Sequence, residues 1–504
     1  MMLGRKTLLI NPPPINGVAF TRQGRCQERD DVLGTTKPPY TLALIAELLR
    51  RSGCEVRLVD ATVERLMIDQ VVARLAQDGF EPTLILFPST TPTLDADVAA
   101  IARLKARYGA PMFCFGPHAS TVPELAMERA PEVDGMFVGE PEEAAVQLAG
   151  LDSPARAGEV ASLIWRHSGP VVSHRAHGTY SGFLTMPYPA WDLVPLRRYG
   201  LPLVDKPYVI VETSRGCPYS CDFCVAPIHQ GHKFRERDPK ALVDEIERTH
   251  REQGIEFFYL WGDTVTLNVK SFSAFCDELI DRKLPIRWFG NARADNLTDP
   301  AFVHRLKRAG CWMLALGIET ESEDLRKNMV KRLERQKIEA AFRNMRDAGI
   351  RSFAFFILGY PGETLETMHH TAQYAIELHP DFANFYPAVP YPGTAMHRKV
   401  VEDGLLPEGA DADWSKMEYS YYLLSGNGLN ERVVMDAIHR AKRRFFLRPG
   451  YLARHLGDVA RLALSKQSIF VQVMSRTLFG AKVIDTSQAT LRNAPAALAE
   501  ADRR

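Results

Sequence analysis

The sequence lacks the features that mark membrane-spanning, nucleic-acid-binding and secreted proteins. No apolar run approaches the roughly 18 residues of a transmembrane helix. Charge is balanced, with a formal net charge of +1 over 504 residues, which gives no general attraction to nucleic acid. The apolar part of the N-terminus fits a short strand better than the hydrophobic region of a signal peptide. We therefore expect a globular protein of two or three domains.

Cysteine is scarce outside one short stretch. Five of the eight cysteines stand alone in the chain, without the spacing of a disulfide framework. They are Cys26, Cys54, Cys114, Cys276 and Cys311. Free thiols are typical of reducing compartments, so we expect the protein in the cytoplasm.

The other three cysteines, Cys217, Cys221 and Cys224, follow a β-rich stretch with the spacing C-x3-C-x2-C. Thiolates this close can converge on one metal centre, and such thiolates hold iron–sulfur clusters. A cubane cluster has four irons, so three cysteines leave one iron open to a substrate or cofactor, as at catalytic metal sites. A zinc site completed by His229 or His232 is an alternative, although zinc ligands usually come as two close pairs.

An aromatic residue, Phe223, precedes the last of these cysteines. With it, the pattern resembles the signature of radical S-adenosylmethionine (SAM) enzymes. The resemblance implies that the thiolates hold a 4Fe–4S cluster whose fourth iron is chelated by the amino and carboxylate groups of SAM. It also implies that an electron from the cluster cleaves SAM, and that the resulting 5′-deoxyadenosyl radical abstracts hydrogen from a substrate.

Residues 1–150 alternate strand-like and helix-like patterns. Strands are expected at 6–10, 55–59, 83–87, 111–115 and 135–138, and helices at 40–52 and 95–108. This alternation predicts right-handed βαβ units and a Rossmann-like parallel sheet. Ligands of such sheets bind beyond the carboxyl ends of the strands.

The loops at those strand ends resemble the cobalamin-binding domain of cobalamin-dependent radical SAM enzymes. The resemblance implies cobalamin contacts at Asn11, Pro12, Ser89, Thr90, Gly116, His118, Ser120, Gly139 and Glu140. The pattern D-x-H-x-x-G, which supplies a histidine to cobalt, is absent. Either the cobalt has no histidine ligand or the domain does not hold cobalamin. For His118 we favour packing within its loop over cobalt ligation.

From 206 to 398, strands and helices alternate again, in about six units. They predict a partial (β/α)6 barrel of the radical SAM type, with polar residues just after the strands, where barrel enzymes place their sites. Segments 261–263, 317–320 and 357–363 resemble the SAM-binding motifs of the family. The resemblance implies SAM contacts at Phe223, Gly262, Asp263, Arg293, Gly317, Glu319, Thr320 and Gly359.

We expect residues 151–205 to connect the two domains and 399–504 to form a mostly helical region. Between 431 and 482, eleven lysines and arginines stand against three acidic residues. We favour a basic-faced helical cap on the barrel, and a peripheral contact with anionic lipid is the alternative.

The whole pattern predicts a cobalamin-dependent radical SAM enzyme of the grouping that includes magnesium-protoporphyrin ester cyclases and carbon or phosphorus methylases. By this resemblance it would use a 4Fe–4S cluster, SAM and cobalamin to methylate a small molecule, with an external electron donor such as flavodoxin or ferredoxin. Radical cyclisation or rearrangement of a tetrapyrrole, lipid or natural product is the alternative reaction. A cluster-bearing sensor without catalysis is the alternative class.

Overall fold

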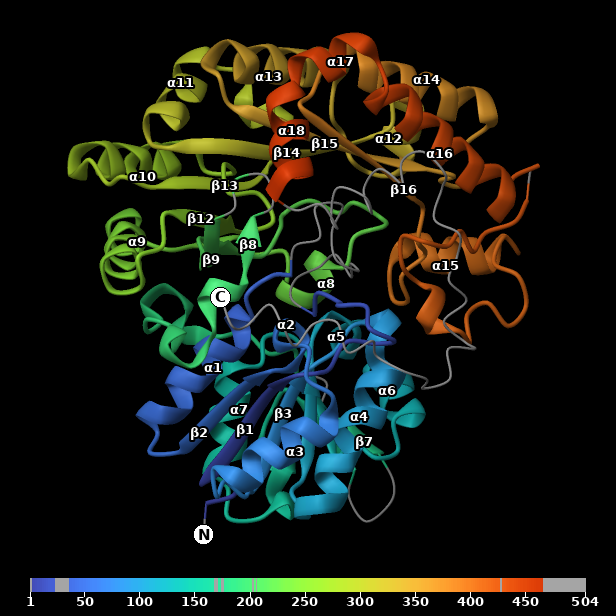
Figure 1. Cartoon of the computed structure of the whole chain (residues 1–504). Coiled ribbons are helices and arrows are strands. Elements are labelled where there is room, and N and C mark those ends of the chain that lie inside the picture. Colours follow the sequence, from blue (N-terminus) through green and yellow to red (C-terminus); the bar gives the residue numbers. More distant parts are fainter. Residues whose placement is uncertain are drawn as a thin grey trace.

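The structure is a computed structural model that describes residues 2–22, 36–166, 171–173, 176–201, 204, 206–426 and 428–465. Cys26 and the end of the basic C-terminal stretch, from 466 onward, lie outside these residues. Figure 1 shows two α/β domains, with the N-terminal sheet below a curved second sheet and its outer helices. None of the helices described is long and apolar enough to cross a membrane.

Five parallel strands form the centre of the N-terminal sheet, in the order β2-β1-β3-β4-β5. They are β1 (Lys6–Asn11), β2 (Glu55–Asp60), β3 (Leu84–Pro88), β4 (Met112–Phe115) and β5 (Gly135–Phe137). Side chains of β1 alternate between two hydrophobic clusters, with Leu8 and Ile10 on one face and Leu9 on the other. The predicted Rossmann-like sheet is confirmed.

Helices bury both faces of this sheet, which explains why inner strands such as β3 and β4 are continuous apolar runs in the sequence. The first face is covered by α3 (Ile68–Gln77) and α4 (Leu94–Tyr108), and the second by α1 (Tyr40–Arg51) and α7 (Glu142–Gly150).

The segment expected to connect the two domains adds strands to both sheets. β6 (Leu163–Arg166) and β7 (Val171–Ser173) extend the N-terminal sheet beyond β5 in antiparallel orientation. β8 (Gly200–Leu201) pairs antiparallel with β9 (Lys206–Glu212) at the edge of the second sheet. The N-terminal sheet therefore continues past residue 150, because β6 and β7 follow each other without the helical crossover that marks the earlier strands.

Six parallel strands form the second sheet, in the order β16-β15-β14-β13-β12-β9, and the predicted partial barrel is confirmed. After β9 these are β12 (Phe257–Trp261), β13 (Arg287–Ala292), β14 (Cys311–Glu319), β15 (Arg351–Leu358) and β16 (Phe382–Pro387). The helices on the outer face are α9 (Pro239–Gln253), α10 (Val269–Arg282), α11 (Pro300–Arg308), α13 (Arg335–Ala348) and α14 (Leu365–Glu377) (Figure 1).

The C-terminal helices pack beside β15 and β16. Within α16 (Glu431–Phe446), Phe445 meets Phe385 edge-on. From α17 (Pro449–Arg454), Tyr451 donates a hydrogen bond of 2.8 Å to the Asp381 carbonyl, just before β16. From α18 (Leu456–Ser465), Asp458 pairs with Arg351 at 3.0 Å, at the start of β15. The contacts of Tyr451 and Asp458 lie at the amino ends of the strands, and that of Phe445 lies within β16, so the described part of the basic stretch packs against the barrel.

The two domains share one hydrophobic cluster. Val225, from the barrel, and Trp414 and Met417, from the loop after α15 (Ala395–Glu402), belong to the cluster that buries β1, β3 and α4 of the N-terminal domain. Arg129, from α6 (Pro123–Arg129), places its guanidinium 4.5 Å from the centre of the Trp414 ring. The hydrophobic core of the N-terminal domain therefore includes residues from beyond the domain boundary in the sequence.

Candidate active site

The three cysteines lie on one loop beyond the carboxyl end of β9 and line a single cavity of about 300 Å³. The loop follows β10 (Ser214–Arg215) and begins at Gly216, whose φ is +81°. A side chain at Gly216 would collide with the carbonyl of Lys233, so this turn requires glycine. Cys217 is buried, and Cys221 and Cys224 are half-buried. The four other cysteines within the described residues are buried free thiols.

Most residues expected to contact SAM line the same cavity. They are Phe223, Gly262, Asp263, Arg293, Gly317 and Glu319. Thr320 and Gly359 do not line it. The Thr320 hydroxyl lies 3.1 Å from that of Thr371 and accepts from the Ser322 amide, and Gly359 lies against Tyr422, whose hydroxyl donates to its carbonyl at 2.9 Å. Both residues therefore fix the position of the backbone next to the cavity and do not face the cavity themselves.

A buried lysine that the sequence analysis missed, Lys331, lies in the cavity wall beside Glu319. Its Nζ is 2.7 Å from Glu319 Oε1. Burial lowers the pKa of Lys331, but the ion pair with Glu319 outweighs this and leaves the pKa above its ordinary value. Glu319 itself has a φ of +70°, at a break in the register between β14 and β15. Backbone strain of this kind gathers at functional sites.

Two contacts fix the cysteine loop to the barrel. The Arg293 guanidinium lies 3.8 Å from the centre of the Tyr219 ring, within the loop, and pairs with Asp295 at 3.1 Å. On the other side, the Tyr360 hydroxyl donates to Asp222 at 2.5 Å. These contacts orient the loop from the carboxyl ends of β13 and β15.

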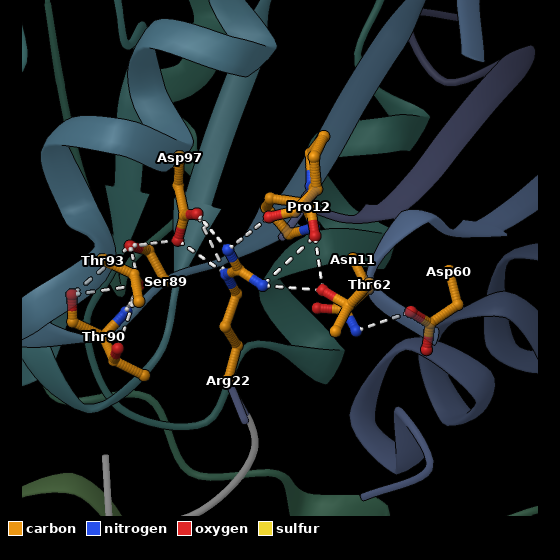
Figure 2. A network of polar contacts seen from close by, with 10 residues as sticks. Asn11, Pro12, Arg22, Asp60, Thr62, Ser89, Thr90, Thr93 and Asp97 are labelled. Atoms are coloured by element: carbon orange, nitrogen blue, oxygen red, sulfur yellow. Dashed lines mark hydrogen bonds and ion pairs between the residues drawn. The ribbon is translucent and has the colours of Figure 1, made fainter. Parts of the chain in front are cut away.

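In the N-terminal domain, a buried arginine that the sequence analysis also missed joins two of the predicted cobalamin loops (Figure 2). Arg22 pairs with Asp97 at 2.6 Å and donates to the Pro12 carbonyl at 3.1 Å and the Thr62 hydroxyl at 2.8 Å. The Ser89 hydroxyl donates to Asp97 at 3.0 Å. Burial raises the pKa of Asp97 despite the neighbouring guanidinium. Arg22 thus ties together the loops that follow β1 and β3.

Two other predicted cobalamin residues lie at the edges of this network (Figure 2). Asn11 donates to Asp60 at 2.9 Å, and the Thr90 hydroxyl lies 2.9 Å from that of Thr93. Asn11 Oδ1 is buried and has no hydrogen-bond partner among the residues that the structure describes. This oxygen is an acceptor for a ligand at the carboxyl end of β1, where Rossmann-like sheets bind their ligands.

Ser120 links the loops after β4 and β5 to the cysteine segment. Its hydroxyl donates to the Gly116 carbonyl at 3.1 Å, accepts from the Gly139 amide at 2.9 Å and lies 2.9 Å from His229 Nδ1. His229 belongs to α8 (Ala226–Gln230), the helix directly after Cys224. Burial lowers the pKa of His229 to about 4, so the imidazole is neutral at physiological pH.

His118 is buried in α5 (Pro117–Thr121). Its Nδ1 lies 3.0 Å from the Thr91 hydroxyl, and its ring meets Trp414 edge-on at 4.3 Å. Burial, and then the nearby Arg129, lower its pKa to about 3. The neutral ring packs against protein, as a loop-packing histidine does, while its Nε2 has no hydrogen-bond partner within the described part of the chain.

A buried ionic cluster joins the two domains. Arg215, two residues before Cys217, pairs with Glu140 at 3.1 Å and Glu142 at 2.6 Å from the N-terminal domain, and with Glu212 of β9 at 2.8 Å. Arg235 also pairs with Glu140. Burial lowers the pKa of Arg215, but the three carboxylates outweigh it and raise this pKa well above its ordinary value.

The donor groups fit an iron–sulfur cluster better than zinc. Three thiolates that open on one cavity suit a cluster with an open iron. Within the described ranges, no three His, Cys, Asp or Glu side chains are placed to share a single metal ion, and His229 is bonded to Ser120 instead.

Two family descriptions match the chain: the radical SAM superfamily over residues 211–375 and the B12 binding domain over 31–149. The chain belongs to the radical SAM superfamily and carries a B12-binding domain. The first match spans the cysteine loop and strands β12 to β15, and the second spans most of the loops of Figure 2. The cofactors of this radical SAM protein are a 4Fe–4S cluster, SAM and cobalamin.

Known proteins share this architecture. The chain is 26% identical over 466 residues to an uncharacterized methyltransferase of Pyrococcus horikoshii, which covers 91% of this chain and 97% of that protein. It is 26% identical over 420 residues to the anaerobic magnesium-protoporphyrin IX monomethyl ester cyclase of Cereibacter sphaeroides, with 82% and 67% covered. The structure of the cobalamin-dependent SAM radical enzyme OxsB with aqua-cobalamin bound has a TM-score of 0.69 and 16% identity, covering 94% of this chain and 71% of that one. The likeness to OxsB shows the fold.

Proposed function

We propose that this radical SAM protein is a cobalamin-dependent methyltransferase that acts on an unactivated carbon or phosphorus of a small molecule. The observation that carries the proposal is the contact between the two domains at the cysteine loop, where Ser120 of the B12-binding domain bonds His229, five residues after Cys224. This contact joins the loops that we propose to bind cobalamin to the helix directly after the cysteine loop. The similarity to a methyltransferase over nearly the whole chain supports the same function.

In this proposal the side chains bind and orient the cofactors, and the cofactors supply SAM cleavage and methyl transfer when bound. Cys217, Cys221 and Cys224 hold the cluster. The Lys331 ammonium attracts the SAM carboxylate, while Glu319 attracts the SAM ammonium or ribose hydroxyls. The other cavity residues, Phe223, Gly262, Asp263, Arg293 and Gly317, surround SAM, and Thr320 and Gly359 hold the adjoining backbone.

In the N-terminal domain, the loops after β1, β3, β4 and β5 hold cobalamin in this proposal. Their residues are Asn11, Pro12, Ser89, Thr90, Gly116, His118, Ser120, Gly139 and Glu140. Asn11 Oδ1 would accept a hydrogen bond from an amide of the corrin side chains, because it is buried and no donor among the described residues reaches it.

The experiment uses full-length protein reconstituted anaerobically with iron, sulfide and cobalamin, then given SAM and a chemical reductant. We expect 5′-deoxyadenosine from the wild type and none from Cys221→Ala. Cys276→Ala removes a buried thiol on α10, away from the cysteine loop, and serves as the matched control. Cleavage that persists in Cys221→Ala, or its absence from wild type with a full cluster, would contradict the proposal.

The second candidate is a radical cyclisation or rearrangement without methylation, favoured by the similarity to the ester cyclase. Formation of S-adenosylhomocysteine alongside 5′-deoxyadenosine, in the presence of the true substrate, supports methylation. Deoxyadenosine without S-adenosylhomocysteine supports the second candidate.

We also propose that a flavodoxin or ferredoxin reduces the cluster in the cytoplasm. Reduced flavodoxin should replace the chemical reductant in the cleavage assay, and an inactive mixture would argue for another donor.

A further inference from the structure

The helices α17 and α18 bury one face and expose the other. Tyr451 and His455, four residues apart, are buried against the start of β16. Leu452 and Leu456 follow them by one position each and are 41% and 66% exposed. The His455 amide donates to the Tyr451 carbonyl at 3.0 Å, and the Val459 amide to the His455 carbonyl at 2.9 Å, so a helical turn leads from α17 into α18. Residues four apart share a helical face, and the two leucines therefore form one apolar strip on the outer side of these helices.

Three arginines from separate parts of the chain gather beside this strip. Arg454 ends α17 between the two leucines, Arg448 directly precedes α17, and Arg346 lies in the last turn of α13. His379 lies in the turn between α14 and β16. Burial lowers the pKa of this imidazole, and the positive charges of Arg454, Arg448 and Arg346 lower it further. The three guanidinium groups therefore stand close to one ring at the amino ends of β15 and β16.

Acidic side chains nearby do not neutralise these arginines. Asp458 pairs with Arg351 at 3.0 Å, and Asp381 accepts from the Ser352 amide at 2.8 Å. Within the described part of the chain, no carboxylate forms an ion pair with any of the three arginines. Asp347 adjoins one of them in the sequence, which leaves three positive charges against one negative charge. The leucine strip is therefore bordered by an excess of positive charge.

This surface lies at the opposite end of the barrel from the cofactor loops. Figure 1 shows α17 on the far side of the molecule from the N-terminal sheet. β15 has eight residues and so spans about 26 Å from this surface to its carboxyl end, after which Tyr360 holds the cysteine loop. A partner bound here lies away from both the cluster and the B12-binding domain. Such a position suits an anchor and does not suit an electron donor.

We infer that the outer face of α17 and α18, together with Arg346, binds an anionic lipid surface. Leu452 and Leu456 enter the boundary between the headgroups and the acyl chains, while the guanidinium groups contact lipid phosphates. Guanidinium groups favour phosphate because they can donate two parallel hydrogen bonds to it. The basic stretch thus caps the barrel with its inner face and binds lipid with its outer face. Lipid binding is independent of the proposed reaction, because this surface includes no residue of the cofactor sites.

Sedimentation of the full-length protein with lipid vesicles tests this surface. We expect binding to vesicles of phosphatidylcholine mixed with phosphatidylglycerol, weakening as salt is raised, and little binding to phosphatidylcholine alone. The double variant Arg346→Gln with Arg454→Gln should bind the mixed vesicles roughly tenfold or more weakly, since each basic residue near such a membrane contributes roughly fivefold. Leu452→Ser with Leu456→Ser keeps the charge and should weaken binding by a similar factor, because it removes the apolar strip.

The matched control is Arg251→Gln with Leu365→Ser, which removes an exposed arginine from α9 and an exposed leucine from the start of α14. It should bind the mixed vesicles as the wild type does. All six substituted side chains are exposed, so urea midpoints close to the wild-type value should show that each variant is folded.

Several outcomes would overturn the inference. They are equal binding to the two kinds of vesicle, wild-type binding by both test variants, and an equal loss of binding in the control. Inorganic phosphate provides a further comparison. If it displaces the protein from the mixed vesicles at the concentration of the lipid phosphate, the arginines bind a small soluble anion, and lipid is rejected as the partner.

Discussion

The Tyr360 hydroxyl and a carboxylate oxygen of Asp222 lie 2.5 Å apart, and they join the loop after β15 to the middle of the cysteine loop. Asp222 follows Cys221 directly, so this bond sets the position of the central cysteine. Burial raises the pKa of the Asp222 carboxyl, and the hydrogen bond from Tyr360 opposes that shift. The cysteine loop is therefore held in place by Tyr360, which follows β15, a strand that supplies none of the three cysteines.

Tyr360→Phe should loosen the cluster without removing a cysteine. The variant loses a hydrogen bond to a buried carboxyl group, which contributes about 1–3 kcal/mol to stability. We expect faster release of iron to a chelator than in the wild type, with the same iron content after reconstitution. Tyr108→Phe removes a hydroxyl from α4, where the hydrogen bond is 3.4 Å long, and should release iron at the wild-type rate. Equal rates in all three proteins would contradict a positioning role.

Lys331→Met should weaken SAM binding and destabilise the fold. It leaves the Glu319 carboxylate buried without its cation, and breaking a buried ion pair costs about 3–5 kcal/mol. The double variant Lys331→Met with Glu319→Gln should recover much of the stability, because no buried charge remains, but not the affinity for SAM. Urea unfolding and equilibrium binding of SAM measure the two effects. Recovery of SAM affinity in the double variant would assign the pair a purely structural role.

Arg215→Met should uncouple the two domains. Its removal leaves Glu140, Glu142 and Glu212 buried together, which we expect to cost about 3–5 kcal/mol and to separate one unfolding transition into two. Calorimetry checks this, with Arg156→Met as the control, since the ion pairs that Arg156 forms with described residues are exposed. A single unfolding transition at the wild-type temperature would show that the ion pairs of Arg215 do not couple the two domains.

Glu363 should make the protein less stable as pH rises. Burial raises its pKa to about 8, although the amides of Gly359 and Tyr360 oppose the shift. The folded state thus holds a proton that the unfolded state releases above the ordinary pKa of 4.5, and stability falls between pH 4.5 and about 8.

Glu363→Gln carries no titrating group, so its stability should change less with pH over that window. Urea midpoints across the window measure the effect. Glu366→Gln, three residues on and exposed, should keep the wild-type slope. A Glu363→Gln slope equal to that of the wild type would assign the pH dependence to other groups.

Sequence patterns predicted both sheets and the cysteine loop, because buried strands are apolar runs and cluster ligands lie close together in the chain. The same patterns missed Lys331 and Arg22, whose partners Glu319 and Asp97 stand 12 and 75 residues away and share no motif with them. They did not assign β6 and β7 to the N-terminal sheet, since two short antiparallel strands without a crossover helix leave only a weak signal of where they pair. Arg215 stands two residues before Cys217 in the sequence. Its role could not be predicted there, because its three carboxylate partners come together only in the folded chain.

The hydrophobic cluster shared by the domains constrains how the chain can be recombined with its relatives. A chimera cut at residue 205 would separate Trp414 and Met417 from the N-terminal hydrophobic cluster to which they belong. Such a hybrid would present mismatched apolar surfaces and should aggregate. A donor B12-binding domain has to be transplanted together with the loop after α15. The interface between the domains is therefore encoded by two separate stretches of the gene.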